Sequence, residues 1–175
     1  MKIIFALFVT FLLTGCSGKS MKPIDFKDQK PRLVIEDYLS GKVKAYGILQ
    51  NRSGKVTRQF SADLNGTWDG KQLVLDEKFN WSDGEVQTRK WKISKIDEHN
   101  YEGTAEDVVG KARGFSYGPA FKFEYVLLVP IKGKEIKITF DDWIFKQDEK
   151  IAINRATMTK FGIKVAELTV MFVKN

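Results

Sequence analysis

Turn-forming residues divide the chain after Gly41 into segments of about ten residues, a length typical of β-strands. In several of these turns a glycine follows a polar residue, and glycine supplies the positive φ angle that tight hairpins need. The turn sequences are NRSG (51–54), DG (69–70), SDG (82–84), DEHN (97–100), KG (132–133), QDEK (147–150) and KFG (160–162). This series predicts consecutive antiparallel strands joined by hairpins.

Apolar residues alternate with polar ones in the clearest of these segments, as expected for strands with one buried face. The apolar positions are Leu73, Leu75, Phe79 and Trp81, then Phe121, Phe123, Tyr125, Leu127 and Val129, and finally Ala166, Leu168, Val170 and Phe172. Such strands must curl into a closed barrel or fold as two sheets to bury that face and their edges. We therefore predict an all-β fold, an antiparallel up-and-down, lipocalin-like barrel of about nine or ten strands.

A short N-terminal helix is predicted ahead of the strands, in the sequence PRLVIEDYLSG (31–41). Pro31 suits the first turn of a helix, and Gly41 suits the position that ends one. The preceding sequence, SGKSMKPIDFKDQK (17–30), is polar, small and charged without a sustained period. That composition is typical of a flexible tether.

The first residues have the order of a secretory signal. Met1 and Lys2 form a minimal basic region, and the apolar run that follows ends in Gly15 and Cys16. This run is shorter than the ~20 residues that a bilayer span needs. The sequence LTGC (13–16) resembles the lipobox of bacterial lipoprotein precursors, which implies a lipidated Cys16 carrying diacylglyceryl and, usually, a further acyl chain such as palmitate. The alternative is a chance cysteine after a general signal peptide.

Ser17 bears on the destination of such a lipoprotein, because enterobacterial-type sorting retains precursors with Asp at this position in the inner membrane. We therefore expect a lipid-anchored protein of the outer membrane that faces the periplasm. The expected organisation is a signal peptide over residues 1–15, a lipidated cysteine and flexible tether over 16–31, and a single β-barrel domain over 32–175.

The charges are dispersed rather than gathered. The chain has 29 Lys and Arg against 22 Asp and Glu, and the basic residues alternate with acidic or apolar ones. This pattern is typical of a solvated surface, and it does not favour nucleic-acid binding. Attraction to an anionic lipid headgroup surface is the alternative.

Residues for nucleophilic or metal chemistry are scarce. Cys16 is the only cysteine, and His99, the only histidine, falls in the DEHN turn, where we expect it to be exposed. A Ser-His-Asp triad and a multi-histidine metal site are therefore not expected, and no cofactor is predicted. The glycine-rich sequence at 103–121 lacks the spacing of a phosphate-binding loop. It is either a flexible lip over the mouth of the barrel or a plain long connection.

Two charged residues are predicted to face the interior of the barrel. Alternation from Phe140 places Asp142 on the apolar face of its strand, and alternation from Ile153 places Arg155 on the apolar face of the next. If neighbouring strands bring these two together, they form a buried ion pair that is structural or orients a ligand headgroup. The candidate ligand-binding residues are Phe121, Phe123, Tyr125, Asp142 and Arg155.

Longer stretches of the chain resemble one known family as a whole. They are VKAYGILQNRSGKVTRQF, GTWDGKQLVLDEKFNWSDGE, RKWKI, GTAEDVVGKARG and FDDWIFKQDEKIAINRATMTKFGIKVAELTV. Over residues 33–172 they are similar to an uncharacterised lipoprotein family of Gram-negative bacteria, catalogued only as a domain of unknown function. The resemblance implies a lipidated precursor and a compact β domain. The association of relatives with gene groups for fatty-acyl lipid modification favours a lipid-related role.

The hypothesis that follows is an outer-membrane lipoprotein whose barrel binds or passes an acyl-chain ligand, a fatty-acyl chain or a phospholipid, in the periplasm. The alternative is a ligand-free structural or assembly factor of the cell envelope, which an interior filled by Phe121, Phe123, Tyr125 and Leu127 would favour. A hydrolase or lipid-modifying enzyme is the third possibility. An inward carboxylate with a strongly raised pKa beside a cavity would favour it.

Overall fold

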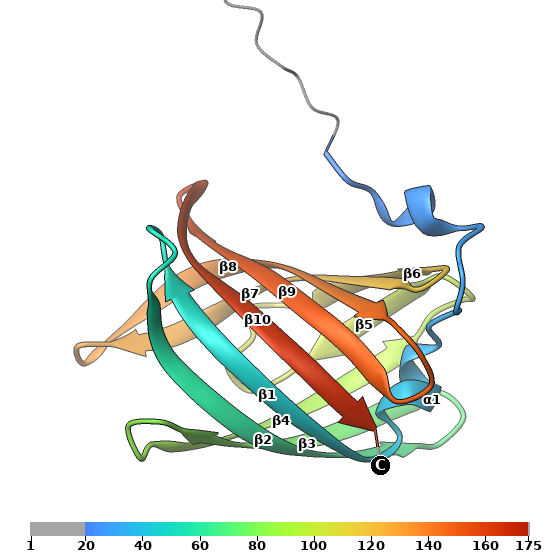
Figure 1. Cartoon of the computed structure of the whole chain (residues 1–175), viewed down its shortest axis with the longest axis horizontal. Helices are drawn as coiled ribbons and strands as arrows, with labels where there is room; N and C mark the ends of the chain where they lie inside the picture. Colours follow the sequence, from blue (N-terminus) through green and yellow to red (C-terminus); the bar gives the residue numbers. More distant parts are fainter. Residues whose placement is uncertain (1–19, 175) are drawn as a thin grey trace, which may run out of the picture.

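A computed structural model describes residues 20–174, and ten antiparallel strands form a closed barrel within them (Figure 1). Each strand pairs with its neighbours in sequence, and β1 also pairs with β10, which closes the sheet. The prediction of an all-β antiparallel barrel of nine or ten strands is confirmed. The strands are β1 (Gly41–Asn51), β2 (Val56–Trp68), β3 (Gln72–Trp81), β4 (Val86–Lys95), β5 (Asn100–Thr104), β6 (Ala112–Tyr117), β7 (Ala120–Ile131), β8 (Lys134–Lys146), β9 (Ile151–Lys160) and β10 (Ile163–Lys174).

A single turn of helix, α1 (Ile35–Leu39), plugs one end of the barrel (Figure 1). Ile35 and Leu39 are buried against the barrel interior. The helix begins at Ile35 rather than at Pro31 because the barrel uses the backbone of Leu33. The Leu33 amide donates to the carbonyl of Gly118 at 2.8 Å, and the Ser116 hydroxyl donates to the Leu33 carbonyl at 3.0 Å. No helix in residues 20–174 is long and apolar enough to cross a membrane.

The plug lies directly against Gly66 of β2, the first residue of the GTW tripeptide. A Cβ at Gly66 would stand 2.0 Å from the carbonyl oxygen of Leu39, so only glycine fits there while α1 stays in place. Trp68 ends β2. The absence of a side chain at Gly66 therefore lets α1 lie directly against β2.

Part of the segment predicted as a tether packs on the outside of the barrel. A 3₁₀ turn, η1 (Pro23–Phe26), brings the Phe26 ring to 6.0 Å from the Trp143 ring and 5.4 Å from the Phe145 ring, measured between centroids. Trp143 is buried although it points away from the interior, because Phe26 covers it. Residues from Pro23 onward are thus attached to the outer face of β8. Cys16 and the predicted signal lie outside the described residues.

The other end of the barrel has no helix over it in the described part of the chain, and its wall is incomplete on one side. β5 and β6 are short, and β4 pairs with β5 only through residues 92–95. Residues 105–111 fill part of the space between β4 and β7, where the Val109 amide donates to the Val126 carbonyl at 2.8 Å and the Leu128 amide to the Asp107 carbonyl at 2.9 Å. This stretch, predicted as a lip or a connection, is held along β7.

Candidate functional site

Six polar residues meet in the interior, about midway between the plugged and the open end. They come from five strands and from the 105–111 segment. We call them the polar layer: Glu77 (β3), Arg89 (β4), Asp107, Tyr125 (β7), Asp142 (β8) and Asn154 (β9). A group of ionisable side chains inside an otherwise apolar barrel is the feature that most needs a functional explanation.

Asp142 is held by two donors. The Tyr125 hydroxyl donates to its Oδ2 at 2.9 Å, and the Asn154 amide donates to its Oδ1 and also to the Trp143 carbonyl, the latter at 3.0 Å. Burial raises the pKa of Asp142 to about 6, although both of these hydrogen bonds favour its charged form. Asp142 therefore faces inward, as the alternation of β8 predicts.

Arg89 makes a two-pronged ion pair with Asp107. Its Nε donates to the carboxylate at 3.0 Å and its Nη2 at 2.7 Å, and both side chains are mostly shielded from solvent. Charge-assisted contacts with two donors on one carboxylate add geometric specificity as well as energy. The pair fastens the 105–111 segment to β4 across the incomplete part of the wall.

Glu77 stands opposite Arg89 in the β3–β4 register, yet the guanidinium is turned toward Asp107. Among residues 20–174, no cation lies within ion-pairing distance of the Glu77 carboxylate. Burial raises the pKa of Glu77 to about 7; Arg89 and a hydrogen bond from Trp91 oppose this rise, whereas Asp142 and Asp107 add to it. Near neutral pH this carboxyl is therefore divided between its charged and protonated forms.

Two spaces lie on either side of the polar layer. A cavity of about 100 Å³ lies on the side of the plug, and a hollow of about 960 Å³ takes in the open end together with part of the outer surface of β2 to β4. Glu77, Arg89 and Tyr125 line both. The inner cavity is smaller than the roughly 300–1,000 Å³ of ordinary ligand sites. The open-end hollow is the larger space, and only part of its volume lies inside the barrel.

The predicted ligand-binding rings lie mainly on the plug side. Phe121 and Phe123 are buried and line only the inner cavity, where Phe121 packs edge-on against Tyr101 and Phe123 packs against Trp91. Tyr125 belongs to the polar layer and stacks on Phe140 at 4.9 Å. These rings fill the plug half of the interior and leave the open half hollow.

The predicted ion pair between Asp142 and Arg155 is wrong. Arg155 faces outward, with 64% of its side chain exposed, and pairs with Glu167 at 2.9 Å. The inward residues of β9 are the small or polar ones, Ala152, Asn154 and Ala156, while Ile153 lies on the surface. The prediction fails because it took the isoleucines of β9 as its buried face.

Sequence reasoning also missed Glu77, Arg89, Asp107 and Asn154. A signal for two of them is present, since Glu77 sits between Leu75 and Phe79 on the apolar face of β3. Arg89 precedes Trp91 on the inward face of β4 in the same way. A charge at an apolar position of an alternating strand is thus the pattern that reveals them. Asp107 lies in an irregular segment and carries no such signal.

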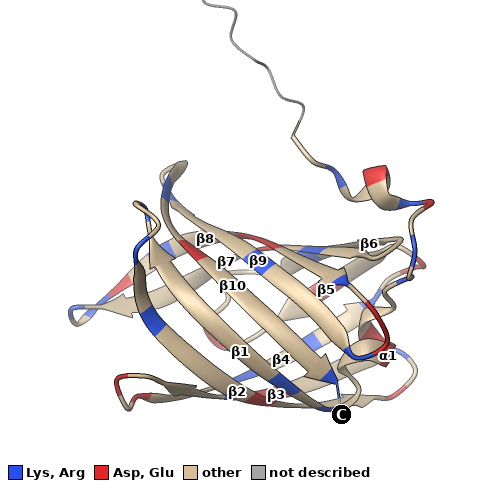
Figure 2. Ribbon diagram, in the orientation of Figure 1, with Lys and Arg blue, Asp and Glu red and all other residues tan. Residues whose placement is uncertain are grey.

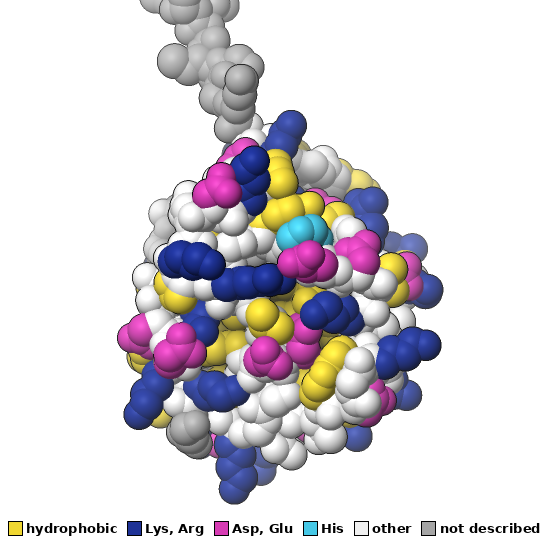
Figure 3. Space-filling view, turned by 90° about the vertical axis from the view of Figure 1, so that its right-hand side faces the viewer, with side chains coloured by type: hydrophobic (Ala, Val, Ile, Leu, Met, Phe, Trp, Pro, Cys, Tyr) yellow, Lys and Arg dark blue, Asp and Glu magenta, His cyan; other side chains and the backbone are white. Residues whose placement is uncertain are grey.

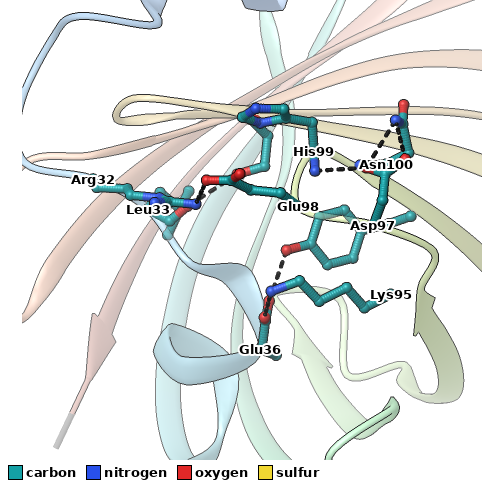
Figure 4. A network of polar contacts seen from close by, with 10 residues as sticks. Arg32, Leu33, Glu36, Lys95, Asp97, Glu98, His99 and Asn100 are labelled. Atoms are coloured by element: carbon teal, nitrogen blue, oxygen red, sulfur yellow. Dashed lines mark hydrogen bonds and ion pairs between the residues drawn. The ribbon is translucent and has the colours of Figure 1, made fainter.

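A second group of polar residues, which does not belong to the polar layer, holds α1 in place (Figure 4). The Glu36 carboxylate of α1 pairs with Lys95 at 2.5 Å and accepts a hydrogen bond from the Tyr101 hydroxyl at 2.9 Å.

His99, predicted to be exposed, is half-buried, because its ring stacks on Tyr117 at 4.1 Å and Nδ1 lies 2.8 Å from the Ser116 carbonyl oxygen.

The outer charges are scattered, as predicted. Basic and acidic residues are interspersed along the strands and hairpins (Figure 2), and side chains of both signs appear together on the face that Figure 3 shows. Among the described residues, no group of three or more potential ligands is arranged to hold a metal ion.

Ten antiparallel strands closed around one core, with a plug at one end and a hollow at the other, define a lipocalin-like barrel protein. The chain belongs to the family described as "Protein of unknown function (DUF3833)", whose model matches residues 10–174. A comparison with curated proteins returned no match.

Two solved structures share the fold at low sequence identity. The S-type phycobiliprotein lyase CPES from Guillardia theta is 9% identical with a TM-score of 0.60, over 80% of this chain and 90% of that one. A protein of unknown function from the DUF3598 family of Nostoc punctiforme is 14% identical with a TM-score of 0.62, over 84% of this chain and 51% of that one. At these identities the similarity establishes the fold alone.

Proposed function

We propose that the protein is an outer-membrane lipoprotein, anchored through Cys16, whose barrel binds or passes an acyl-chain ligand in the periplasm. The observation that carries the ligand-binding part is the open-end hollow. Its inward-facing wall is mainly apolar, with Arg58 and Gln87 as polar exceptions, and the polar layer forms its floor. A concave apolar site with a few convergent polar groups is the usual form of a small-molecule site.

The ligand would occupy the open half. Aromatic rings and α1 fill the plug half, whereas Phe79, Leu127, Phe140, Met158 and Leu168 border a space large enough for a chain. Burial of apolar surface contributes about 0.8 kcal/mol per CH₂ group, so a chain of a dozen carbons has ample driving force to enter.

Native mass spectrometry tests ligand binding. All strands, the plug and the core lie within residues 20–174, so a chain that begins at Ser17 retains every contact of the barrel that the structure describes. This chain is purified without detergent and then offered fatty acids, fatty amines and phospholipids. We expect a co-purifying or added lipid at a ratio of one per chain. Repeated absence of any bound lipid would contradict the ligand-binding part of the proposal.

Membrane anchoring and sorting need their own experiment. In a Gram-negative host, the full chain is expected to incorporate labelled palmitate and to fractionate with the outer membrane, whereas Cys16→Ser should lose the label and enter the soluble periplasm. Ser17→Asp should redirect the labelled protein to the inner membrane. Unchanged labelling in Cys16→Ser would contradict the predicted lipobox.

The second candidate function is a ligand-free structural or assembly factor of the envelope. The packing of Phe121 and Phe123 into the plug half favours it, because that half has little room for a ligand. A barrel that stays empty in the mass-spectrometric experiment, yet is needed for envelope integrity, would support this candidate over the first.

A further inference from the structure

We propose that the ligand binds with its polar end against the polar layer, and that this polar end carries an ammonium group. The ligand class is therefore a single-chain cationic amphiphile, such as an alkyl amine or a lipid with an amino headgroup. This inference rests on the proposed function, because it names the chemistry of the ligand that the barrel would hold.

The charges of the polar layer point to a cation. Three carboxyl groups, Glu77, Asp107 and Asp142, converge there with a single guanidinium, that of Arg89. The other side chains that face the group are neutral: Tyr125 from β7, Asn154 from β9 and Trp91 from β4. One positive charge among three carboxyls leaves an excess of negative charge in a low-dielectric interior, which a bound cation would offset.

The acceptors that remain open point the same way. Asp107 already takes two donors of the Arg89 fork, whereas Glu77 has no ion-pair partner among residues 20–174. Each oxygen of Asp142 accepts one hydrogen bond and has a lone pair left for another. An ammonium group has three donors and no acceptor, which matches these open positions.

An anionic headgroup fits the same place poorly. A fatty-acid carboxylate would have to displace Asp107 from Arg89, and it would then lie beside Glu77 and Asp142. Like charges held this close disfavour each other's ionised forms. The polar layer at the floor of the hollow therefore favours a cationic headgroup over an anionic one.

Three ligands with the same 12-carbon chain separate the headgroups: dodecylamine, dodecan-1-ol and dodecanoic acid, each below its micelle concentration. Binding to the chain from Ser17 is measured at pH 8 by calorimetry and by the fluorescence of the tryptophans that line the hollow and cavity. We expect the amine to bind about 10- to 100-fold more tightly than the alcohol, the effect of a hydrogen bond to a charged group. The acid should bind most weakly.

Glu77→Gln is the variant that tests the contact. It keeps the shape of the side chain and removes its charge, so amine affinity should fall about 10-fold or more while alcohol affinity stays within about twofold. Glu149→Gln is the matched control, because Glu149 is exposed in the β8–β9 loop at the plugged end and the change in net charge is the same. It should leave both affinities unchanged.

The pH dependence of amine affinity adds a measurement that would not change if Glu77 had only a structural role. Wild-type affinity for the amine should rise as the pH increases from 5 to 8, because Glu77 loses its proton with a pKa of about 7 while the amine stays charged. This rise should be smaller in Glu77→Gln, and Glu149→Gln should retain it in full.

The outcomes separate this inference from the proposed function. If dodecanoic acid binds as tightly as the amine, or if Glu77→Gln and Glu149→Gln behave alike, the cationic ligand is ruled out while the barrel remains a carrier of acyl chains. If none of the three ligands binds, the carrier function fails and the inference fails with it.

Discussion

Two inward-facing glutamates, Glu36 and Glu77, show how the surroundings of a residue set its charge in this barrel. Burial by itself would raise the pKa of Glu36, but hydrogen bonds from Lys95 and Tyr101 outweigh it, and the pKa of Glu36 is lowered. For Glu77, Arg89 and a hydrogen bond from Trp91 do not outweigh the loss of solvation, and its pKa is raised to about 7. The same side chain is therefore a fixed anion at the plug and a titrating group in the polar layer.

Glu77→Gln should stabilise the protein at pH 8 and have little effect at pH 5. The pKa of Glu77 in the folded chain lies above its ordinary value of 4.5, so the folded state binds more protons between pH 4.5 and about 7. The free energy of unfolding contributed by Glu77 therefore falls as the pH rises through this window. The variant removes that loss, which is on the order of 1–3 kcal/mol.

Urea unfolding of the ligand-free chain at the two pH values measures this difference. Asp142, whose pKa is also raised, is present in both proteins, so its contribution cancels to first order. Destabilisation by Glu77→Gln at pH 8 would show instead that Arg89 holds Glu77 as a stabilising anion.

At the scale of elements, alternation and turn chemistry carry most of the information. Hairpin turns and the apolar faces of β3, β7 and β10 are readable from the sequence because period-two patterns and glycine turns are local. Asp142 follows from the same rule. The buried face of β9 does not follow from alternation. Asn154 is buried and Ile153 is exposed because of how β9 pairs with β8 and β10.

The N-terminal segment illustrates a limit of another kind. Phe26 is followed only by polar residues up to Pro31 and preceded by an irregular mixture, so no periodicity marks the segment as attached. What attaches it is a patch on the outer face of β8, formed by Trp143 and Phe145, together with close approach to Gly118. Such a contact between distant parts of the chain leaves no pattern within the segment itself.

Gly118→Ala should detach this segment. A Cβ there would stand 1.9 Å from the Phe26 carbonyl oxygen, and the residue has φ of +53°. Gly162→Ala is the control, with φ of +75° and open space around it. Both changes cost about 1 kcal/mol of backbone strain, but only Gly118→Ala should free the hydrogen-bonded backbone around Lys27 for faster cleavage by trypsin. Equal cleavage rates in the two variants, measured by limited proteolysis, would argue against tight docking.

At the scale of the whole molecule, the two ends of the barrel differ in how firmly they are closed. The plug is fixed by buried apolar side chains and by the Glu36 network, whereas Arg89 and Asp107 fasten a single irregular segment beside the hollow. Neither assignment is visible in the sequence, because each depends on which residues meet after the sheet closes. Elements with few buried apolar contacts open at the lowest free-energy cost. A ligand is therefore expected to pass the 105–111 segment and not the plug.

A pair of variants tests this division. Glu36→Ala leaves the buried Tyr101 hydroxyl without its acceptor and should lower the free energy of unfolding by about 2 kcal/mol. It should change the dissociation rate of a neutral ligand, dodecan-1-ol, by less than about twofold. The reason is that α1 does not limit release if the ligand leaves by another route. Asp107→Asn weakens the two-pronged pair with Arg89 and should raise that rate about fivefold or more, with a smaller loss of stability. Stopped-flow fluorescence gives the rates and urea unfolding gives the stabilities. Faster release in Glu36→Ala than in Asp107→Asn would place the route at the plugged end, and the hollow would then be a binding site without being the entrance.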